Sequence, residues 1–443
     1  MAIPPLTYDD LKKLIEADTV AIRGVATLEP AGGPGDKIFP PTHAVDDKNK
    51  KPGAKYAFET RRINGQDATC VLIDSVQSQA NRMEEALQAL WDERKIALPV
   101  VTVDFSQYPT NEQDENGTKK ALAPEVGRVT SLTAPHRIAD ALLRDSLLDG
   151  QLFRLSEIGK SFTDASTKNA AALFKVCPTG LVFGLWDSTG PKGGLGAKFQ
   201  RALVSEIVGI NAVPGSKTES RIDPAQMVNA AAVLYRKSPA PGELLTWTAN
   251  ENEAQRESVG SETNVALKWG AKLKDGAWKQ GDGKLTTANH SNIPPTIDTL
   301  GGGVTIDEAK HTIVLSLASL RRLGFATGAT EARTALAALG LLAGLASESR
   351  GHDLRSRCLL VPKKGSALKL EAVSRDGSTT DLVLDLTGAI ILFNDAVRAL
   401  PDELRFEKPA GEALAKLTPS PKLVDLVKRS RDLAAAGADV GEA

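Results

Sequence analysis

The sequence is poor in cysteine and in aromatic residues. Its 443 residues include three cysteines, Cys70, Cys177 and Cys358, which are too few and too widely spaced for a disulfide framework or a paired-cysteine metal motif. All three stand in apolar stretches, so we expect buried thiols in a reducing compartment. Phe, Trp and Tyr make up 5% of the chain, which argues against a binding surface built mainly from stacked aromatic rings.

An excess of one charge and a long apolar run are also lacking. The 54 basic and 55 acidic residues give a net charge of −1, which excludes a polybasic tail but not a local basic groove. The longest apolar run, 335–346, is shorter than the about 18 residues of a membrane span. The first residues, with Asp9 and Asp10, do not read as a secretory signal. We therefore expect a cytoplasmic protein that is not attached to a membrane.

Strand-like and helix-like segments alternate along the chain, which predicts an α+β fold. The clearest helix is expected over 74–93, where apolar residues recur at helical spacing from Val76 to Leu90. The other expected elements are helices over 8–17, 135–148, 197–208 and 330–349 and strands over 20–28, 56–63, 69–74, 174–186 and 312–318.

The predicted domain organisation is one elaborated domain over 1–400 and a helical C-terminal extension over 401–443 with a disordered end. Stretches rich in Gly, Pro or polar residues interrupt the domain, and stretches of this length inside a compact domain are functional or disordered. They cover residues 29–55, 95–130 and 236–303.

Polar side chains gather on the helix that follows Asp74. Hydroxyl, amide and guanidinium groups beside the free backbone N–H groups of a helix start suit a phosphate or a phosphodiester backbone. The alternative is a solvated helix face with Asp74 or Ser75 as the cap. The residues on or beside this polar face are Ser75, Gln77, Ser78, Gln79, Asn81 and Arg82.

A glycine-rich segment before the expected helix 197–208 carries Lys192, Lys198 and Arg201 without an acidic residue between 190 and 201. Glycines allow a backbone to approach a ligand closely. The segment matches neither the P-loop nor the dinucleotide-binding motif. We expect a loop that contacts phosphates without hydrolysing a nucleotide; the alternative is that its glycines only turn the chain.

Further basic residues stand at His136 and Arg137, at the start of a predicted helix, and at Arg61 and Arg62, beside the Asn64–Gly65 hairpin signal. A histidine at a helix start is more commonly a cap than a catalytic group. No catalytic triad is recognisable, and the five histidines are too scattered for a metal cluster. We therefore expect no catalytic residue, no metal and no cofactor.

Three longer stretches resemble a single family. They are LIDSVQSQANRMEEAL (72–87), LTAPHRIADALLRDS (132–146) and FGLWDSTGPKGGLGAKFQRALVSEI (183–207). They are similar to the RAMP-superfamily backbone subunit of the type I-U (I-G) CRISPR Cascade effector complex. The resemblance implies an RRM-like (ferredoxin-like) palm, with thumb-like or finger-like insertions at 29–55 and 95–130.

The same resemblance implies a function without catalysis. Several copies would stack in a helical filament along one guide RNA (crRNA), hold its phosphates and riboses regardless of sequence, and present it to a target DNA strand in antiviral defence. Implied partners are further copies of the chain, the cap and large subunits of Cascade and a helicase-nuclease. The residues that we predict to contact RNA are Arg61, Arg62, Ser75, Gln77, Ser78, Gln79, Asn81, Arg82, His136, Arg137, Lys192, Lys198 and Arg201.

Two alternatives belong to other classes. The chain could be a metal-independent endoribonuclease that matures the CRISPR transcript, with His136 as general acid or base and Lys198 or Arg201 stabilising charge. It could also be an enzyme that binds a nucleotide or phosphosugar through the loop 190–196.

Overall fold

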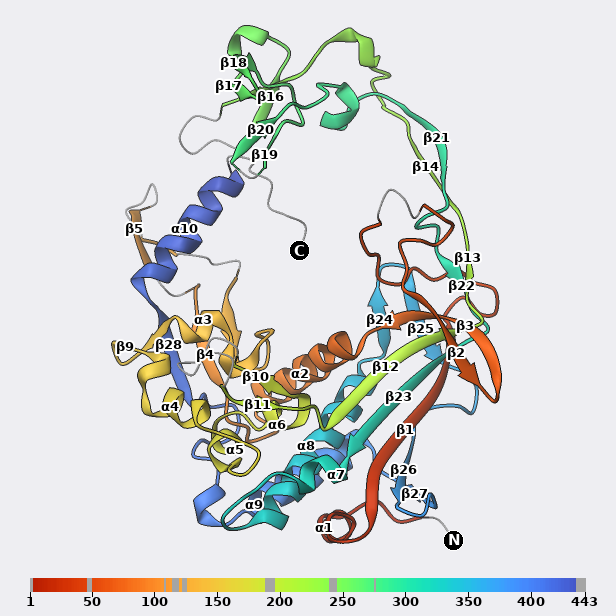
Figure 1. The fold of residues 1–443 in the computed structure, drawn as a ribbon, viewed down its shortest axis with the longest axis vertical. Coiled ribbons are helices and arrows are strands. Elements are labelled where there is room, and N and C mark those ends of the chain that lie inside the picture. The colour runs from red at the N-terminus through yellow and green to blue at the C-terminus, as the bar shows by residue number, and fades with distance from the viewer. Residues whose placement is uncertain are drawn as a thin grey trace. The chain divides into compact units, whose positions relative to one another are not determined.

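The chain divides into two compact units. The computed structural model, drawn as a ribbon in Figure 1, describes residues 3–45, 50–106, 109–113, 119–121, 126–187, 196–238, 245–274 and 276–435. Unit 1 contains Met1–Gly215 and Leu300–Ser420, and unit 2 contains Ser216–Thr299 and Pro421–Ala443. Within the described residues, no helix combines the length and the apolarity that membrane crossing requires.

Unit 1 contains a nine-stranded antiparallel sheet, whose long strands β1, β12 and β23 run side by side (Figure 1). Its strands lie in the order β2–β3–β12–β23–β1–β25–β24, and β26 pairs with both β1 and β27. Side chains that alternate between the two faces of a strand explain the alternating burial along β1. The strands are β1 (Thr19–Pro30), β2 (Phe58–Ile63), β3 (Gln66–Asp74), β12 (Leu203–Ile210), β23 (Glu308–Ser316), β24 (His352–Arg355), β25 (Cys358–Pro362), β26 (Lys369–Ser374) and β27 (Thr379–Leu382).

Two long helices pack on this sheet. The helix α2 (Val76–Asp92) contacts β12, and α8 (Ala329–Ser349) contacts β23 and α2. Since α1 (Tyr8–Glu16) and α9 (Leu386–Arg398) pack on other sides of α8, α8 is buried over most of its surface. That position explains why its sequence consists mainly of Ala, Leu and Gly. The three cysteines are free and buried, as expected.

Unit 1 also contains a second sheet of five strands, in the order β7–β4–β28–β8–β9. Its strand β28 lies within the predicted C-terminal extension and pairs in parallel with β4. The remaining elements are short. They include β4 (Val101–Asp104), β5 (Pro109–Gln113), β6 (Lys119–Ala121), β7 (Arg128–Thr130), β8 (Ser146–Leu148), β9 (Gln151–Leu152), β13 (Val213–Pro214), β22 (Val304–Thr305), β28 (Ala415–Pro419), α4 (Glu157–Thr163) and α7 (Leu317–Arg321).

The described residues of unit 2 form small antiparallel strand pairs, short 3₁₀ helices and the helix α10 (Pro421–Ala435). It contains most of the predicted loop-rich stretch 236–303. The disordered end predicted for the chain lies outside the described residues. The strand pairs are β14 (Lys217–Arg221) with β21 (Ile293–Asp298), β15 (Tyr235–Lys237) with β16 (Thr246–Thr248), β17 (Arg256–Val259) with β18 (Glu262–Ala266), and β19 (Lys272–Lys274) with β20 (Ala277–Lys279).

The combination of helices with sheets that are mainly antiparallel confirms the predicted α+β class. Three local predictions were wrong. The expected helix 197–208 is β11 (Lys198–Phe199) followed by β12, and the expected strand 174–186 contains α5 (Ala171–Val176) and α6 (Thr179–Phe183) before the short strand β10 (Leu185–Trp186).

The third wrong prediction is the continuous helix over 135–148. The structure has a 3₁₀ helix (Arg137–Ala139), the short helix α3 (Ala141–Arg144) and then β8. The reason is the backbone at Arg137, whose φ of 54° is incompatible with a right-handed helix. Asp140 then caps α3 by accepting the backbone N–H of Leu142.

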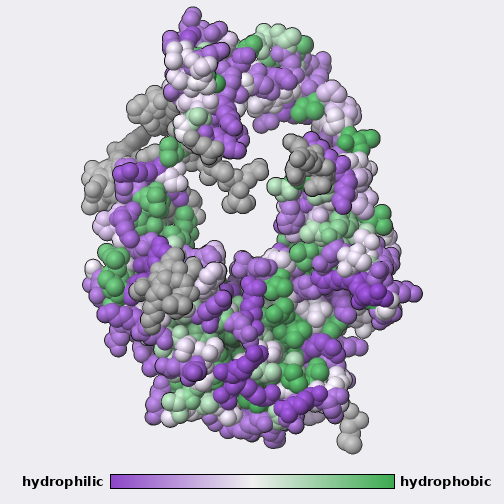
Figure 2. All heavy atoms as spheres, viewed as in Figure 1, coloured by the Kyte–Doolittle hydropathy of each residue, from purple (hydrophilic) through white to green (hydrophobic). Residues whose placement is uncertain are grey.

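The visible surface is mixed in character. On the face shown in Figure 2, hydrophilic residues cover most of the described surface, and hydrophobic residues form small patches between them.

Candidate nucleic-acid interface

Side chains from three segments of unit 1 line a groove of about 510 Å³, here called the basic groove. The segments are the start of α2, the turn at 135–137 and the strand pair β10–β11 with two residues before β10 and two after β11. Among the described residues that line the groove, none is acidic. Five residues that we predicted to contact RNA line it: Gln77, His136, Arg137, Lys198 and Arg201.

The strand pair β10–β11 presents an aromatic ring and a cation on one side. Leu185 pairs with Phe199, and Trp186 pairs with Lys198. The side chains of Leu185 and Phe199 are buried, whereas Trp186 is 58% exposed. The Lys198 ammonium lies 5.4 Å from the centre of the Trp186 ring, which is a cation–π contact. The groove therefore has one exposed ring on which a base can stack.

Arg201 brings a second cation to the groove. Its Nε donates to the carbonyl oxygen of Phe183 at 3.1 Å. A Cβ on Gly184, whose φ is +89°, would lie 3.0 Å from Arg201 Cγ. Glycine at this position therefore allows the Arg201 side chain to pack against the backbone of residue 184. Partial burial and the nearby charge of Arg137 lower the pKa of the Arg201 guanidinium, which stays positively charged. Within the described residues, neither Lys198 nor Arg201 forms an ion pair.

Arg137 lines the groove but is only 8% exposed. Its guanidinium donates to both carboxylate oxygens of Glu84, at 2.7 and 2.8 Å, and to the carbonyl oxygen of Gly184 at 3.0 Å. Because Glu84 matches its charge, Arg137 adds no free cation to the groove. Its position instead indicates a structural role, in which it ties α2 to the segment before β10. His136 beside it is exposed.

The predicted polar face of α2 divides into exposed and capping residues. Gln77 and Asn81 are exposed, and Gln77 lines the basic groove. Ser75 Oγ accepts the backbone N–H of Ser78 at 3.2 Å, so Ser75 is the N-cap of α2. Ser75 therefore caps the helix, which is the alternative role that the sequence offered for it. The prediction of a phosphate contact is kept for the exposed Gln77 and Asn81.

Two other residues of this face interact with the buried Asp74. Gln79 Nε2 donates to Asp74 Oδ2 at 2.6 Å, and Arg82 Nε donates to the same oxygen at 3.0 Å. Arg82 also donates to the carbonyl oxygen of Leu354 at 2.7 Å. These contacts occupy Gln79 and Arg82 within the fold.

Arg61 and Arg62 lie on β2, and neither lines the basic groove. Arg61 donates to both carboxylate oxygens of Glu206, at 2.6 and 3.1 Å. Arg62 donates to the carbonyl oxygen of Gly65 at 2.7 Å and lies 3.5 Å from Asp67. Acidic partners thus offset both charges. The predicted residue Lys192 lies outside the described residues.

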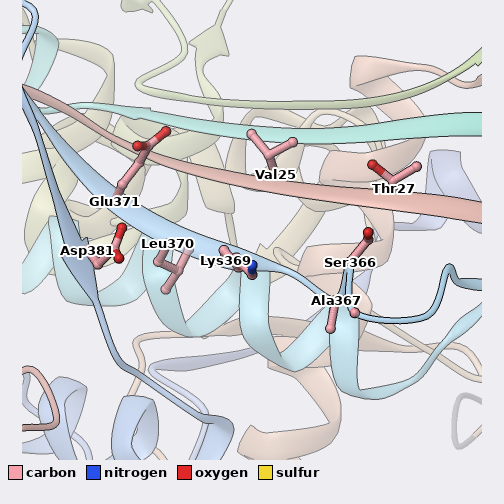
Figure 3. Close-up of a pocket in the computed structure, with 9 residues that line it drawn as sticks. Val25, Thr27, Ser366, Ala367, Lys369, Leu370, Glu371 and Asp381 are labelled. Carbon is pink, nitrogen blue, oxygen red and sulfur yellow. The ribbon is translucent and has the colours of Figure 1, made fainter. Parts of the chain in front are cut away.

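A second groove, of about 320 Å³, lies where β1 runs beside β26 (Figure 3). Lys369, Glu371 and Asp381 line it together with small and apolar side chains. Glu371 is also paired with Arg23. Side chains of both charges make this groove a poorer match to a polyanion than the basic groove is.

Sequence reasoning missed two features. The first is the exposed ring of Trp186, which was not among the predicted RNA contacts. Its position in the sequence, shortly before the glycine-rich segment, is the signal that could have indicated it. The expectation that the histidines are too scattered to form a cluster was also wrong, because the fold brings His311 and His352 to either side of Glu348. Burial would raise the pKa of the Glu348 carboxyl, but the two imidazoles lower it to about 2.

Comparison with known families gives a match that covers less than half of the chain. Residues 22–214 match the family model described as CRISPR-associated protein GSU0053 (Cas_GSU0053). The match includes every described residue that lines the basic groove. It indicates a CRISPR-associated protein with a role in CRISPR defence. No match is found among curated proteins.

Proposed function

We propose that the protein binds the guide RNA as a backbone subunit of a type I-U (I-G) CRISPR Cascade complex and is not an enzyme. One observation carries this proposal. The basic groove gathers an amide, an imidazole, an ammonium and a guanidinium group (Gln77, His136, Lys198 and Arg201) inside the region that matches a CRISPR-associated family. These groups donate hydrogen bonds to phosphate and ribose oxygens, and the ammonium and guanidinium groups also attract the negative charge of the phosphates.

The order of the elements supports an RRM-like palm. The elements β1, α2, β12, β23, α8 and β26 occur along the chain in the order βαββαβ, with other elements inserted between them, and the four strands lie side by side as β12–β23–β1–β26. This is the arrangement of ferredoxin-like folds. In such a protein the groove would hold the guide by its backbone and leave the base edges free to pair with target DNA.

The partners follow from this function. Further copies of the chain would continue along the guide, the cap and large subunits of Cascade would bind the resulting filament, and a helicase-nuclease would act on the target DNA. The cytoplasm is the compartment in which these partners meet.

The direct experiment is to co-express the chain with a CRISPR array and the other Cascade subunits and to analyse the nucleic acid in the purified assembly. We expect RNA of uniform length that contains the spacer sequence. An assembly that purifies in stoichiometric form but contains no RNA would contradict the proposal.

A second candidate function is supported by the exposed His136, which shares the basic groove with Lys198 and Arg201. An imidazole beside two cations could serve a metal-independent endoribonuclease as general acid or base. Incubation of the purified chain with repeat RNA and a chelator separates the two functions. Cleavage that is abolished by His136→Ala supports the nuclease, and intact RNA that stays bound supports the backbone subunit.

Replacement of Trp186 by alanine should weaken the binding of single-stranded RNA at least about fivefold, because stacking of one base on an aromatic ring contributes about 1–3 kcal/mol. The salt dependence of binding should stay unchanged, since no phosphate contact is removed. Fluorescence anisotropy at several salt concentrations measures both quantities. Trp247→Ala, at another partly exposed tryptophan, is the matched control; an equal loss in both variants would remove the ring from the interface.

A further inference from the structure

A buried cluster outside the basic groove holds two imidazoles and a carboxylate. His311 lies on β23, Glu348 in the last turn of α8 and His352 at the start of β24. His311 Nδ1 lies 3.3 Å from Glu348 Oε2, and His352 Nε2 lies 3.3 Å from Glu348 Oε1. Both histidines are buried, with 2% and 6% of their surface exposed. The three groups offer ligand atoms that all lie within 4.8 Å of one another.

A chain of hydrogen bonds determines which nitrogen of His311 carries a proton. Asp74 can only accept, so Gln79 presents Nε2 to it at 2.6 Å and turns Oε1 toward Ser205. Ser205 Oγ donates to this Oε1 at 2.9 Å. The Ser205 oxygen must then accept from His311 Nε2, which lies 3.0 Å away. In a neutral imidazole, His311 Nδ1 therefore carries a lone pair.

That lone pair faces a carboxylate oxygen. His311 Nδ1 and Glu348 Oε2 are both buried, and neither makes a hydrogen bond of acceptable geometry. Two buried electron-rich atoms at 3.3 Å repel each other and lack compensation. A positive charge between them removes the conflict, and it can be a proton on Nδ1 or a metal ion.

We propose that His311, Glu348 and His352 bind one divalent transition-metal ion, with Zn²⁺ as the best fit. Zn²⁺ takes imidazole and carboxylate ligands at about 2.0–2.2 Å, which places tetrahedral ligand atoms about 3.3 Å apart. Each histidine nitrogen lies 3.3 Å from one oxygen of Glu348, His311 Nδ1 from Oε2 and His352 Nε2 from Oε1, so a small turn of the carboxylate brings one oxygen to this spacing from both nitrogens. Two nitrogen ligands favour Zn²⁺ over the oxygen-seeking Ca²⁺ and Mg²⁺.

The surroundings match those of a metal site. The Nε2–H of His311 donates to Ser205, and metal-binding histidines almost always donate their second N–H in this way. With Glu348 bound through one oxygen, the three protein ligands leave one position of the tetrahedron for water. The ion would fasten the end of α8 to β23 and β24. It would stabilise the fold from a place outside the matched residues 22–214.

The first test uses the wild-type chain. After dialysis against a chelator and then against Zn²⁺, mass spectrometry of the metal content should find about one Zn²⁺ per chain, and the melting temperature should rise on zinc addition. Co²⁺ in place of Zn²⁺ should give the visible absorption of a tetrahedral site. A chain that retains no zinc and melts at the same temperature with and without it holds a proton at this position, and the proposal fails.

The second test uses variants. Glu348→Gln keeps the side-chain shape but removes the carboxylate. Ser205→Ala leaves all three ligands in place and removes the hydrogen bonds of Ser205 Oγ to His311 and to Gln79. We expect the zinc dissociation constant, measured by competition with a chromophoric chelator, to rise at least about tenfold in both. His43→Gln, at an exposed histidine outside the cluster, should leave it unchanged. If Glu348→Gln does not fold, the zinc affinity of Ser205→Ala and the spectrum of the cobalt-loaded wild-type chain test the proposal instead. Equal zinc affinity in the wild type and in all variants would contradict the proposal.

Discussion

Replacement of Arg137 by methionine should lower the free energy of unfolding by about 3–5 kcal/mol at pH 8, because loss of one partner leaves a buried charge unpaired. That charge belongs to Glu84, which is 2% exposed and accepts two hydrogen bonds from Arg137. Urea unfolding followed by circular dichroism measures the loss. A decrease below about 1 kcal/mol would be typical of a surface pair and would contradict the buried position.

The pH dependence of this variant provides an internal check. Burial already raises the pKa of the Glu84 carboxyl from 4.5 to about 7, although Arg137 opposes the shift. Without Arg137, the pKa of the Glu84 carboxyl in the folded variant rises further, so Glu84 stays protonated to a higher pH. In the unfolded chain the same carboxyl loses its proton above about pH 4.5. The folded state then binds more protons, so stability falls as pH rises. The variant should therefore be less destabilised at pH 5.5 than at pH 8.

A double variant, Arg137→Met with Glu84→Met, is the matched control for the single one. Replacing both members of a buried pair by apolar groups of similar size is often close to neutral. We expect the double variant to regain more than half of the lost stability, with the remainder due to the unpaired carbonyl of Gly184. It should also lose the pH dependence described above.

Removal of both cations of the basic groove, Lys198→Ala with Arg201→Ala, should weaken RNA binding by roughly 100-fold at low salt, because each hydrogen bond to a charged group contributes about 1.5 kcal/mol or more. The loss should be the same for unrelated RNA sequences, since phosphates carry no sequence information. The slope of log affinity against log salt should become shallower by about 1.4, or about 0.7 for each phosphate contact on a single strand.

The matched control for the groove variant removes two arginines outside it. Arg61→Ala with Arg62→Ala changes the net charge by the same amount but acts on side chains that already pair with Glu206 and Asp67. We expect less than about a threefold loss of RNA affinity from this control. Equal losses in both double variants would mean that net charge, and not the groove, governs binding.

Elements with a long, regular pattern could be predicted from the sequence. The helix α2 and the strands β1 and β23 have a clear period, so their type was correct. β12 was mistaken for a helix because Phe199, Leu203 and Ile207 recur every four residues. As β12 lies between β3 and β23, its buried residues do not alternate regularly with exposed ones, and an apolar segment of this kind fits either structure.

The site could be predicted only in part, because the sequence indicates single residues but not which of them the tertiary fold brings together. Gln77, His136, Lys198 and Arg201 were recognised as single polar or basic residues near chain turns, and the fold places them around one groove. Arg137 and Glu84 are 53 residues apart in the sequence, and a local sequence pattern does not predict a contact over such a separation. The histidine cluster likewise joins a strand, a helix end and a second strand that only the tertiary fold brings together.

Ultraviolet cross-linking of the RNA-loaded assembly, followed by mass spectrometry of the peptides, tests the central claim most directly. We predict cross-linked peptides from the basic groove, above all those that contain Trp186 and Lys198, and the same pattern for guides of unrelated sequence. Cross-links confined to peptides outside the groove, or a pattern that changes with the guide sequence, would contradict the account.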